Sequence, residues 1–245
     1  MTEQTMLRVV FFDAAGTLFE PREPVGESYA RIAREFGVVA AATQVSAAFR
    51  HVFHRTPGLA FGPERTAAEL RRLERQWWHG VVAQVFAGLG RFDDFEAYFA
   101  TLFAFFADSA HWRADPEAAP LLADLKGRGL KLGVISNFDT RLYAILKGLE
   151  LSPYFNSITI SSEAGYAKPA PEIFRTALER NFAQATQALH VGDSEPLDVA
   201  GAQAAGIAAV LIDRDAGERW AVTGRVARVS ALAAITDAMQ KIPFP

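Results

Sequence analysis

The residues with side chains suited to catalysis or metal binding are spread along the chain. Each one comes after an expected strand, either directly or in the loop that follows. In chain order they are Asp13, Ser136, Asn137, Lys168, Asp193 and Asp198. Three carboxylates around a cleft suit Mg²⁺, a hard cation that takes oxygen ligands and keeps several waters. Serine, lysine and backbone N–H groups suit the oxygens of a phosphate. A metal and a lysine would also reduce the repulsion between an anionic nucleophile and an anionic substrate.

The expected strands are short, apolar and rich in β-branched and aromatic residues, which is typical of buried parallel strands. They cover residues 7–12, 132–135, 157–160 and 189–191, with a fifth at 207–212. Helical patterns lie between them, at a segment that starts at Asp115-Pro116 and at residues 140–149, 171–181 and 196–205. This alternation predicts an α/β fold, a parallel sheet with helices on both faces. Ligands bind beyond the carboxyl ends of such strands, so the polar residues should meet at one edge.

A helical segment interrupts the alternation after the first strand. From about residue 20 to residue 109 the sequence shows no convincing strand, and a loop at 54–63 holds two prolines and two glycines. Helical spacing of apolar residues covers residues 27–36, 41–53, 64–86 and 92–107. We therefore predict a core domain formed by residues 1–19 and 112–245, with an inserted all-helical domain at residues 20–111.

Four motifs, in this order and on this fold pattern, resemble those of the haloacid dehalogenase-like (HAD) hydrolase superfamily with a helical cap. They are Asp13-Ala-Ala-Gly-Thr-Leu, Ser136-Asn137, Lys168-Pro169, and Gly192-Asp193 with Asp198. The resemblance covers the whole chain and implies a Rossmann-like core with a cap domain. Three further segments resemble the subgroup of haloacid dehalogenase-like hydrolase domain-containing protein of the third type. They are Gly26-Glu-Ser-Tyr-Ala, Gln76-Trp-Trp and Ile135-Ser-Asn-Phe-Asp.

The resemblance implies a role for the residues that act on the substrate. Asp13 would be the nucleophile and would form an aspartyl-phosphate, which divides one difficult displacement into two easier ones. Lys168, with Ser136 and Asn137, would hold the phosphoryl group that is transferred. The implied substrate is a small phosphorylated metabolite.

The resemblance also implies a Mg²⁺ site. Asp13 and Asp193 would bind the ion through their side chains, and Ala15 through its backbone carbonyl. Asp198 would support the metal site. The carbonyl contact does not depend on the side chain, so alanine at position 15 leaves it intact.

Ala15 is nevertheless the main departure from the family pattern. Most family phosphatases have an aspartate at this position, which protonates the leaving group and later activates water. General acid–base catalysis is typically worth about 10²–10⁴-fold, and esters with poor leaving groups would lose most by its absence. Acyl phosphates and activated aryl phosphates would lose less. Three acidic residues that follow the first motif are candidates to replace the missing carboxylate: Glu20, Glu23 and Glu27.

The leading hypothesis is a Mg²⁺-dependent phosphatase, and two alternatives stay open. One is a catalytically weak HAD-fold pseudoenzyme that binds a ligand or a partner protein, which Ala15 motivates. The other is a 2-haloacid dehalogenase, although those enzymes carry an aromatic residue at the position of Ala15 and lack the acid at Asp193. Phosphonoacetaldehyde hydrolases also carry alanine there but use a cap lysine, and no lysine precedes Lys126 in this chain.

Composition narrows the function classes further. The chain has 245 residues, a net charge of −3 and no cysteine, so disulfides and thiolate chemistry are excluded. The small charge gives no reason to expect nucleic acid or a membrane surface as a partner. The N-terminus shows no signal peptide, and the longest apolar-rich segment, residues 97–107, is too short to cross a bilayer. We expect a soluble cytoplasmic protein, with its oligomeric state left open.

Several cap residues allow two interpretations. Trp77 and Trp78 are expected to serve in packing rather than as a platform for the substrate. If the substrate carries a second anionic group, the candidates to bind it are the cations beside the irregular loop. Those cations are Arg50, His54 and Arg55.

Overall fold

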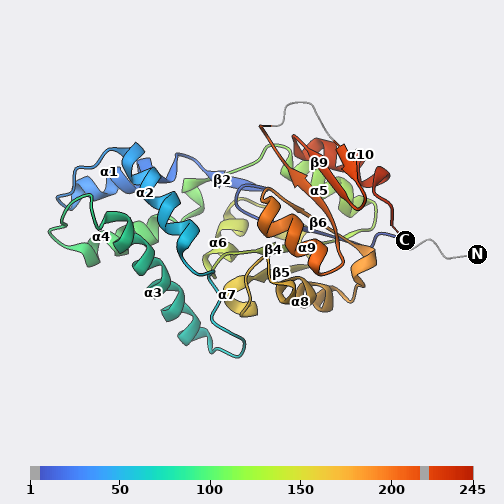
Figure 1. The fold of residues 1–245 in the computed structure, drawn as a ribbon, viewed down its shortest axis with the longest axis horizontal. Helices are drawn as coiled ribbons and strands as arrows, with labels where there is room; N and C mark the ends of the chain where they lie inside the picture. The colour runs from blue at the N-terminus through green and yellow to red at the C-terminus, as the bar shows by residue number, and fades with distance from the viewer. Residues whose placement is uncertain (1–5, 216–220, 245) are drawn as a thin grey trace, which may run out of the picture.

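The computed structural model describes residues 6–215 and 221–244. Residues 1–5, 216–220 and 245, which belong to the predicted core segments, lie outside that description. A seven-stranded sheet with the order β5-β4-β1-β6-β7-β9-β8 forms the centre of the larger lobe, at the right in Figure 1. Its strands are β1 (Val9–Phe12), β4 (Lys131–Ser136), β5 (Ser157–Ile160), β6 (Ala188–Gly192), β7 (Ala208–Ile212), β8 (Ala221–Thr223) and β9 (Val226–Val229). All neighbouring strands are parallel except the antiparallel pair β8 and β9. The predicted α/β fold is therefore confirmed.

The five expected strands are present, but the sequence patterns did not indicate β8 and β9. The two strands have three and four residues, and only two of these seven side chains are fully buried. Strands this short and this exposed lack the continuous apolar pattern that identifies the central strands.

The central strand β1 pairs with β4 on one side and with β6 on the other. Its last residue, Phe12, lies opposite Val134 of β4 and Val191 of β6. The residues that follow these three strands therefore emerge at the same edge of the sheet, which is where the site is built.

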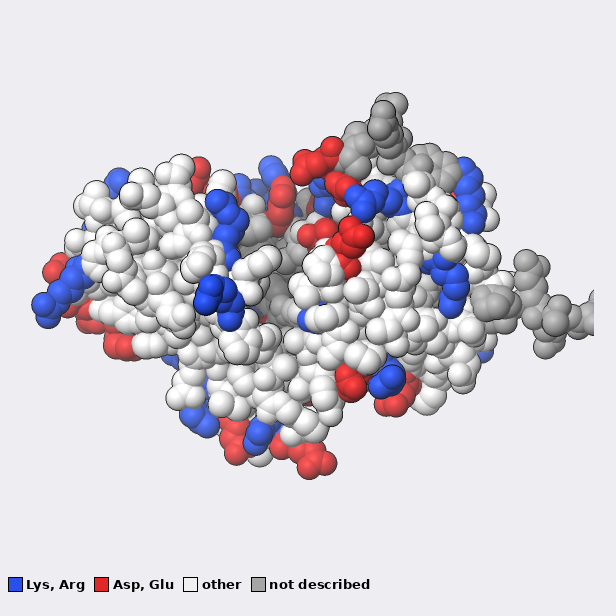
Figure 2. All heavy atoms as spheres, in the orientation of Figure 1, with Lys and Arg blue, Asp and Glu red and all other residues white. Residues whose placement is uncertain are grey.

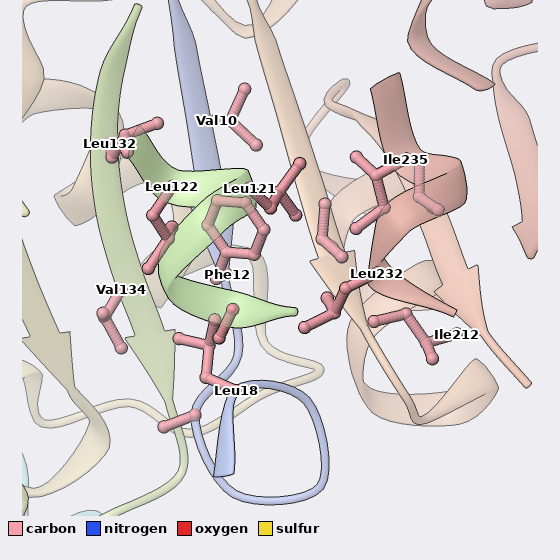
Figure 3. Close-up of a cluster of buried hydrophobic side chains, with 14 of the residues drawn as sticks. Val10, Phe12, Leu18, Leu121, Leu122, Leu132, Val134, Ile212, Leu232 and Ile235 are labelled. Atoms are coloured by element: carbon pink, nitrogen blue, oxygen red, sulfur yellow. The ribbon is translucent and has the colours of Figure 1, made fainter. Parts of the chain in front are cut away.

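Helices cover both faces of the sheet: α5 (Ala118–Gly127), α6 (Arg141–Gly148), α7 (Ser161–Ala164), α8 (Pro171–Asn181), α9 (Ala200–Ala204) and α10 (Ile235–Lys241). Alternate side chains of β1 point to opposite faces, as expected for a strand. Val10 and Phe12 pack against α5, α6 and α10, and Figure 3 shows part of this cluster. Val9 and Phe11 pack against α8 and α9 on the other face.

Two helix starts differ from the prediction. Asp115 does not begin a helix: its Oδ1 accepts a hydrogen bond from the Glu117 N–H, and α5 begins three residues later, at Ala118. The segment predicted as one helix over residues 196–205 is a π-helical turn, Glu195–Val199, followed by α9. The wider turn lies directly after the motif that contains Asp193, and π-helical turns are frequent at functional sites.

Four helices, inserted after β1, form a second lobe at the left in Figure 1: α1 (Val25–Glu35), α2 (Ala42–Arg55), α3 (Ala67–Phe86) and α4 (Phe95–Phe105). They share an aromatic-rich core of their own. Thr66 and Glu69 form a capping box that fixes the start of α3. We refer to these four helices as the cap. Among the described residues, none of the helices combines the length and the hydropathy needed to cross a membrane.

The cap is joined to the sheet lobe by two short strands that the sequence did not predict. β2 (Phe19–Pro21) and β3 (Trp112–Ala114) form an antiparallel pair, with Phe19 opposite Ala114 and Pro21 opposite Trp112. The segment from about residue 20 to residue 109 was expected to contain no strand, and β2 contradicts this at residues 20 and 21. Three-residue strands are too short to show alternation, and only pairing in the folded chain reveals them.

Candidate active site

Three carboxylates and one ammonium group meet at the edge where β1, β4 and β6 end. Asp13, Asp193 and Asp198 each place a carboxylate oxygen within 4.8 Å of the others. The Nζ atom of Lys168 lies 2.8 Å from Oδ1 of Asp13 and 2.6 Å from Oδ1 of Asp198. Sequence reasoning predicted all four residues, and the fold brings all four together.

Glycine allows the close approach of two of these carboxylates. Gly16 has φ +89°, and a Cβ atom there would lie 2.5 Å from Oδ2 of Asp193. A Cβ atom on Gly192 would lie 2.2 Å from Cγ of Asp198. Thr17, in the same turn as Gly16, donates a hydrogen bond of 3.1 Å to Oδ1 of Asp193. The two glycines of the first and last motifs are thus needed for space, and Gly16 also for its backbone conformation.

Asp198 accepts hydrogen bonds from three sides. Its Oδ1 contacts Lys168 and, at 2.8 Å, Nε2 of His190, while Oδ2 accepts from the Ser194 N–H at 3.0 Å. Burial alone would raise the pKa of Asp198, but Lys168 and His190 outweigh it and hold the pKa below its ordinary value. Both oxygens of Asp198 are thus already engaged, and the bond to Oδ1 holds the Lys168 ammonium in place.

Sequence reasoning missed His190. It is the central residue of β6, fully buried, with its ring edge-on to Phe174 at 5.1 Å. A histidine within an apolar strand, two residues before the Gly192-Asp193 motif, was the signal that could have found it.

The surroundings of Asp193 disfavour its negative charge. Desolvation by the surrounding protein raises the pKa of Asp193 to about 6, and the charges of Asp13 and Asp198 act in the same direction. One ammonium therefore does not balance three carboxylates at this edge. The donor set consists of hard oxygen atoms only, which fits Mg²⁺, and Asp13 and Asp193 are the side chains that would hold it.

The two residues of the second motif, Ser136 and Asn137, make different contacts in the structure. Ser136 is the last residue of β4, is buried and lines the cavity described below. Asn137 instead holds the Lys168 backbone: its Nδ2 donates to the Lys168 carbonyl at 3.0 Å, and its Oδ1 accepts from the Lys168 N–H at 2.7 Å. The peptide bond between Lys168 and Pro169 is cis. Asn137 also lines the cavity, and its Nδ2 carries a second N–H besides the one that bonds the Lys168 carbonyl.

A cavity of about 670 Å³ extends from this edge of the sheet to the underside of the cap. Asp13, Ser136 and Lys168 line its polar end. Cap side chains line the other end, among them Phe49, Phe53, Trp77, Trp78, Phe99 and Phe103. Figure 2 shows the surface hollowed between the two lobes, with charges of both signs interspersed around the hollow. The size lies within the range of ligand sites.

Ala15 lines the cavity, and the acidic residues proposed to replace its missing carboxylate do not. Glu20 is paired with Arg113 and Glu23 with Arg31, and Glu27 is exposed on α1. The prediction that one of them fills this space is therefore wrong. Their side chains belong to the junction and to the outer surface of the cap, which the sequence distance from Asp13 did not reveal.

The expected cations beside the irregular loop are only partly near the site. His54 lines the cavity, whereas Arg50 and Arg55 are exposed and are not among its lining residues. The arginine that does line the cavity is Arg141, which sequence reasoning missed. Two of its nitrogens contact the two carboxylate oxygens of Asp139 at 2.8 and 2.6 Å.

The tryptophan pair both packs and lines the cavity. The ring centres of Trp77 and Trp78 are 4.9 Å apart, which agrees with the packing interpretation. Both also lie in the cavity wall. Their indole N–H groups are already used, by the Pro57 carbonyl at 2.9 Å and by Asp139 at 2.6 Å. The two interpretations therefore do not exclude each other.

Comparison with known proteins agrees with this geometry. A sequence model described as haloacid dehalogenase-like hydrolase matches residues 7–206. Haloacid dehalogenase-like hydrolase domain-containing protein 3 of Mus musculus is 36% identical over 218 residues, which is 86% of this chain and 84% of that protein. The protein of the same name in Homo sapiens is 33% identical over 219 residues, with the same coverage.

Solved structures share the fold at low sequence identity. A HAD phosphatase from Thermococcus onnurineus superposes with a TM-score of 0.66 at 22% identity, covering 97% of this chain and all of that one. An L-2-haloacid dehalogenase from Xanthobacter autotrophicus superposes with a TM-score of 0.71 at 20% identity, covering 96% of this chain and 99% of that one. The fold is thus common to phosphatases and to dehalogenases, and the choice between them depends on the site.

Proposed function

The chain belongs to the haloacid dehalogenase-like hydrolases, and we propose that it is a Mg²⁺-dependent phosphatase that acts through an aspartyl-phosphate at Asp13. The observation that carries the proposal is the placement of Asp13 at the polar end of the cavity, with its Oδ1 2.8 Å from Lys168 Nζ. Asp193 and Asp198 complete a carboxylate cluster that fits a hard divalent cation.

In the first step, a carboxylate oxygen of Asp13 attacks the phosphorus atom. The bond between phosphorus and the leaving oxygen breaks, and the leaving group departs with the electron pair. In the second step, water attacks the phosphorus of the aspartyl-phosphate, inorganic phosphate is released and the Asp13 carboxylate is restored. When bound, Mg²⁺ would neutralise part of the phosphoryl charge.

The side chains around Asp13 support these steps. Lys168 is almost fully buried, and burial opposes its charge, but Asp13 and Asp198 hold its pKa above the ordinary value. It therefore remains an ammonium beside Asp13 and can attract a phosphoryl oxygen. The hydroxyl of Ser136, at the same end of the cavity, is placed to donate to another phosphoryl oxygen.

The test is the loss of turnover in Asp13→Asn. The amide keeps the shape of the side chain but is a poor nucleophile, so hydrolysis of activated phosphates should be abolished. Asp124→Asn, on the exposed surface of α5, is the control and should retain full activity. If D13N turned over at the wild-type rate, the aspartyl-phosphate mechanism would be wrong.

Ala15 favours a second candidate, a binding protein with little turnover. That candidate predicts that a broad panel of phosphate esters is not hydrolysed by the wild type or by Ala15→Asp, although Mg²⁺ still binds. A 2-haloacid dehalogenase is less compatible with a site that retains the acid at Asp193. Chelator-sensitive activity and no halide release would separate the phosphatase from it.

A further inference from the structure

We infer that the substrates are aryl phosphates, in which the phosphate is esterified to an aromatic hydroxyl group and the ring occupies the cavity under the cap. This inference rests on the proposed phosphatase function and names the class of leaving group. Three independent features support it: the cavity wall, the pairing of the charges in that wall, and the missing carboxylate at Ala15.

The cavity wall opposite Asp13 is built for an apolar, planar group. The rings of Phe49 and Phe53 are stacked with centres 5.3 Å apart, and Phe53 also lies 6.0 Å from Trp78 and 5.9 Å from Trp77. Aromatic clusters of this kind favour a further ring in stacked or edge-on contact. Because both indole N–H groups are already bonded, a sugar or another polyol would find few partners for its hydroxyl groups.

The lysine and the arginine in the described cavity lining are already paired with carboxylates. The Arg141 guanidinium binds both oxygens of Asp139 and lies 4.1 Å from the ring centre of Phe103 and 5.1 Å from that of Trp78. Lys168 is paired with two carboxylates at the phosphate end. Among the described residues that line the cavity, no lysine or arginine is left for a second phosphate or carboxylate. A neutral leaving group therefore fits best.

The absence of a carboxylic acid side chain at position 15 also favours aryl phosphates as substrates. When Asp13 attacks phosphorus, the leaving oxygen must take the electron pair, and the described cavity lining near Ala15 has no carboxylic acid to protonate it apart from the metal-site carboxylates. A phenol ionises at a pKa of about 10, whereas water, and aliphatic alcohols with it, ionises at about 15.7. An aryl oxide can therefore leave as the anion and take a proton from water afterwards.

Four substrates separate two effects: how well the aromatic ring binds in the cavity, and how easily the leaving group departs from phosphorus. They are 2-naphthyl phosphate, 2-naphthylmethyl phosphate, ethyl phosphate and acetyl phosphate, each tested on the full chain with Mg²⁺. The ratio of kcat/KM for naphthylmethyl to ethyl phosphate measures the cavity, since both leaving groups are alkoxides. The ratio for naphthyl to naphthylmethyl phosphate measures the leaving group. We expect both ratios to exceed tenfold.

Acetyl phosphate distinguishes failure of this inference from failure of the proposed function. Acetyl phosphate is small, and its leaving group, acetate, can depart in the first step without being protonated. If acetyl phosphate is hydrolysed but either ratio is close to one, the aryl phosphate class is wrong and the phosphatase stands. If none of the four is hydrolysed, the phosphatase function fails and the substrate class fails with it.

A pair of variants tests the aromatic wall directly. Phe53 is 42% exposed, so Phe53→Ala should fold normally while losing one ring from the wall. We expect kcat/KM for 2-naphthyl phosphate to fall about 3- to 10-fold, the value of one aromatic contact. The value for acetyl phosphate should change less than twofold. Phe182→Ala removes an aromatic side chain that is 87% exposed and outside the cavity lining, and should change neither. An equal loss on both substrates in F53A would overturn the role of the wall.

Discussion

The Nε2 atom of His190 lies 2.8 Å from Oδ1 of Asp198, and His190 is fully buried and is not among the residues that line the cavity. The carboxylate of Asp198 is ionised and can only accept, so Nε2 carries the proton and donates it. The same oxygen accepts from Lys168, which contacts Asp13 in turn. A buried histidine thus positions the lysine through a shared carboxylate, from outside the cavity lining.

Replacing His190 by phenylalanine should weaken this arrangement. The ring keeps its packing against Phe174, but Asp198 loses one donor. Loss of a hydrogen bond to a buried carboxylate costs about 1–3 kcal/mol, so the free energy of unfolding should fall by that amount. Because Lys168 is then less well held, kcat should fall while KM changes little. Chemical denaturation and steady-state kinetics with Mg²⁺ measure the two effects.

A neighbouring variant controls for stability alone. Leu189 precedes His190 on β6, is also fully buried, and packs into the cluster on the opposite face of the sheet. Leu189→Ala should lose about 2–5 kcal/mol of stability but retain the wild-type kcat below its unfolding temperature. A parallel loss of kcat in L189A would mean that His190 acts only through general stability.

Asp193→Asn should have opposite effects on the metal-free and the metal-loaded protein. The carboxylate of Asp193 is repelled by Asp13 and Asp198, so the amide relieves unfavourable charge and should raise the Tm measured in chelator. The wild type should gain stability as Mg²⁺ is added, whereas the variant should gain much less because a neutral amide oxygen replaces one anionic ligand. A Tm titration with MgCl₂ shows both effects, with Asp124→Asn as the control. Equal stabilisation of wild type and D193N by Mg²⁺ would remove Asp193 from the metal site.

Ala15→Asp should change which step limits turnover. Water attacking the aspartyl-phosphate also needs a base, so a missing carboxylate slows the second step for every substrate. The wild type should release about one equivalent of naphthol in a burst and then turn over slowly, whereas A15D should lose the burst and turn over faster. General acid–base catalysis sets the expected gain in the second step at roughly 10²–10⁴-fold. Rapid-mixing measurements of naphthol release decide this: a wild type without a burst, and a variant without a gain, would contradict it.

Glu74 should make the free energy of unfolding depend on pH. This residue of α3 is buried, and it accepts hydrogen bonds from the N–H of Thr140 at 3.0 Å and from its hydroxyl at 2.6 Å. Burial is the largest influence and raises the pKa of Glu74 above the ordinary value of 4.5, despite the hydrogen bonds that lower it. The folded state therefore holds this proton more tightly than the unfolded state, and stability from this group is lost as the pH rises through the raised pKa.

Glu74→Gln removes that titration and can keep one acceptor for Thr140. The difference in unfolding free energy, variant minus wild type, should therefore increase from pH 4 upward and level off above the raised pKa. Urea denaturation across this range measures the difference. Glu179→Gln, at an exposed position of α8, is the control and should show no such increase. A difference for E74Q that shrinks with rising pH would show that the buried carboxylate prefers its charged form.

The sequence alone determined the central strands of the sheet and the residues of the carboxylate cluster. Buried parallel strands are continuous apolar segments, and polar residues that follow them must meet at one edge, so Asp13, Asp193 and Lys168 could be placed together before any coordinates. These signals are local, because strand period, flanking glycine and motif spacing all lie within a few residues. The helices of the cap were predictable for the same reason.

Only the tertiary structure decided what surrounds that cluster. The positions of His190 and Arg141, the pairing of Asn137 with the Lys168 backbone, and the absence of Glu20, Glu23 and Glu27 from the described cavity lining depend on contacts between distant segments. Even Trp77 and Trp78, visible as a pair in the sequence, took their place in the cavity wall from the docking of α3 against the loop after β4. Side-chain direction and inter-element packing carry no fixed sequence period, so they emerge only when the chain has folded.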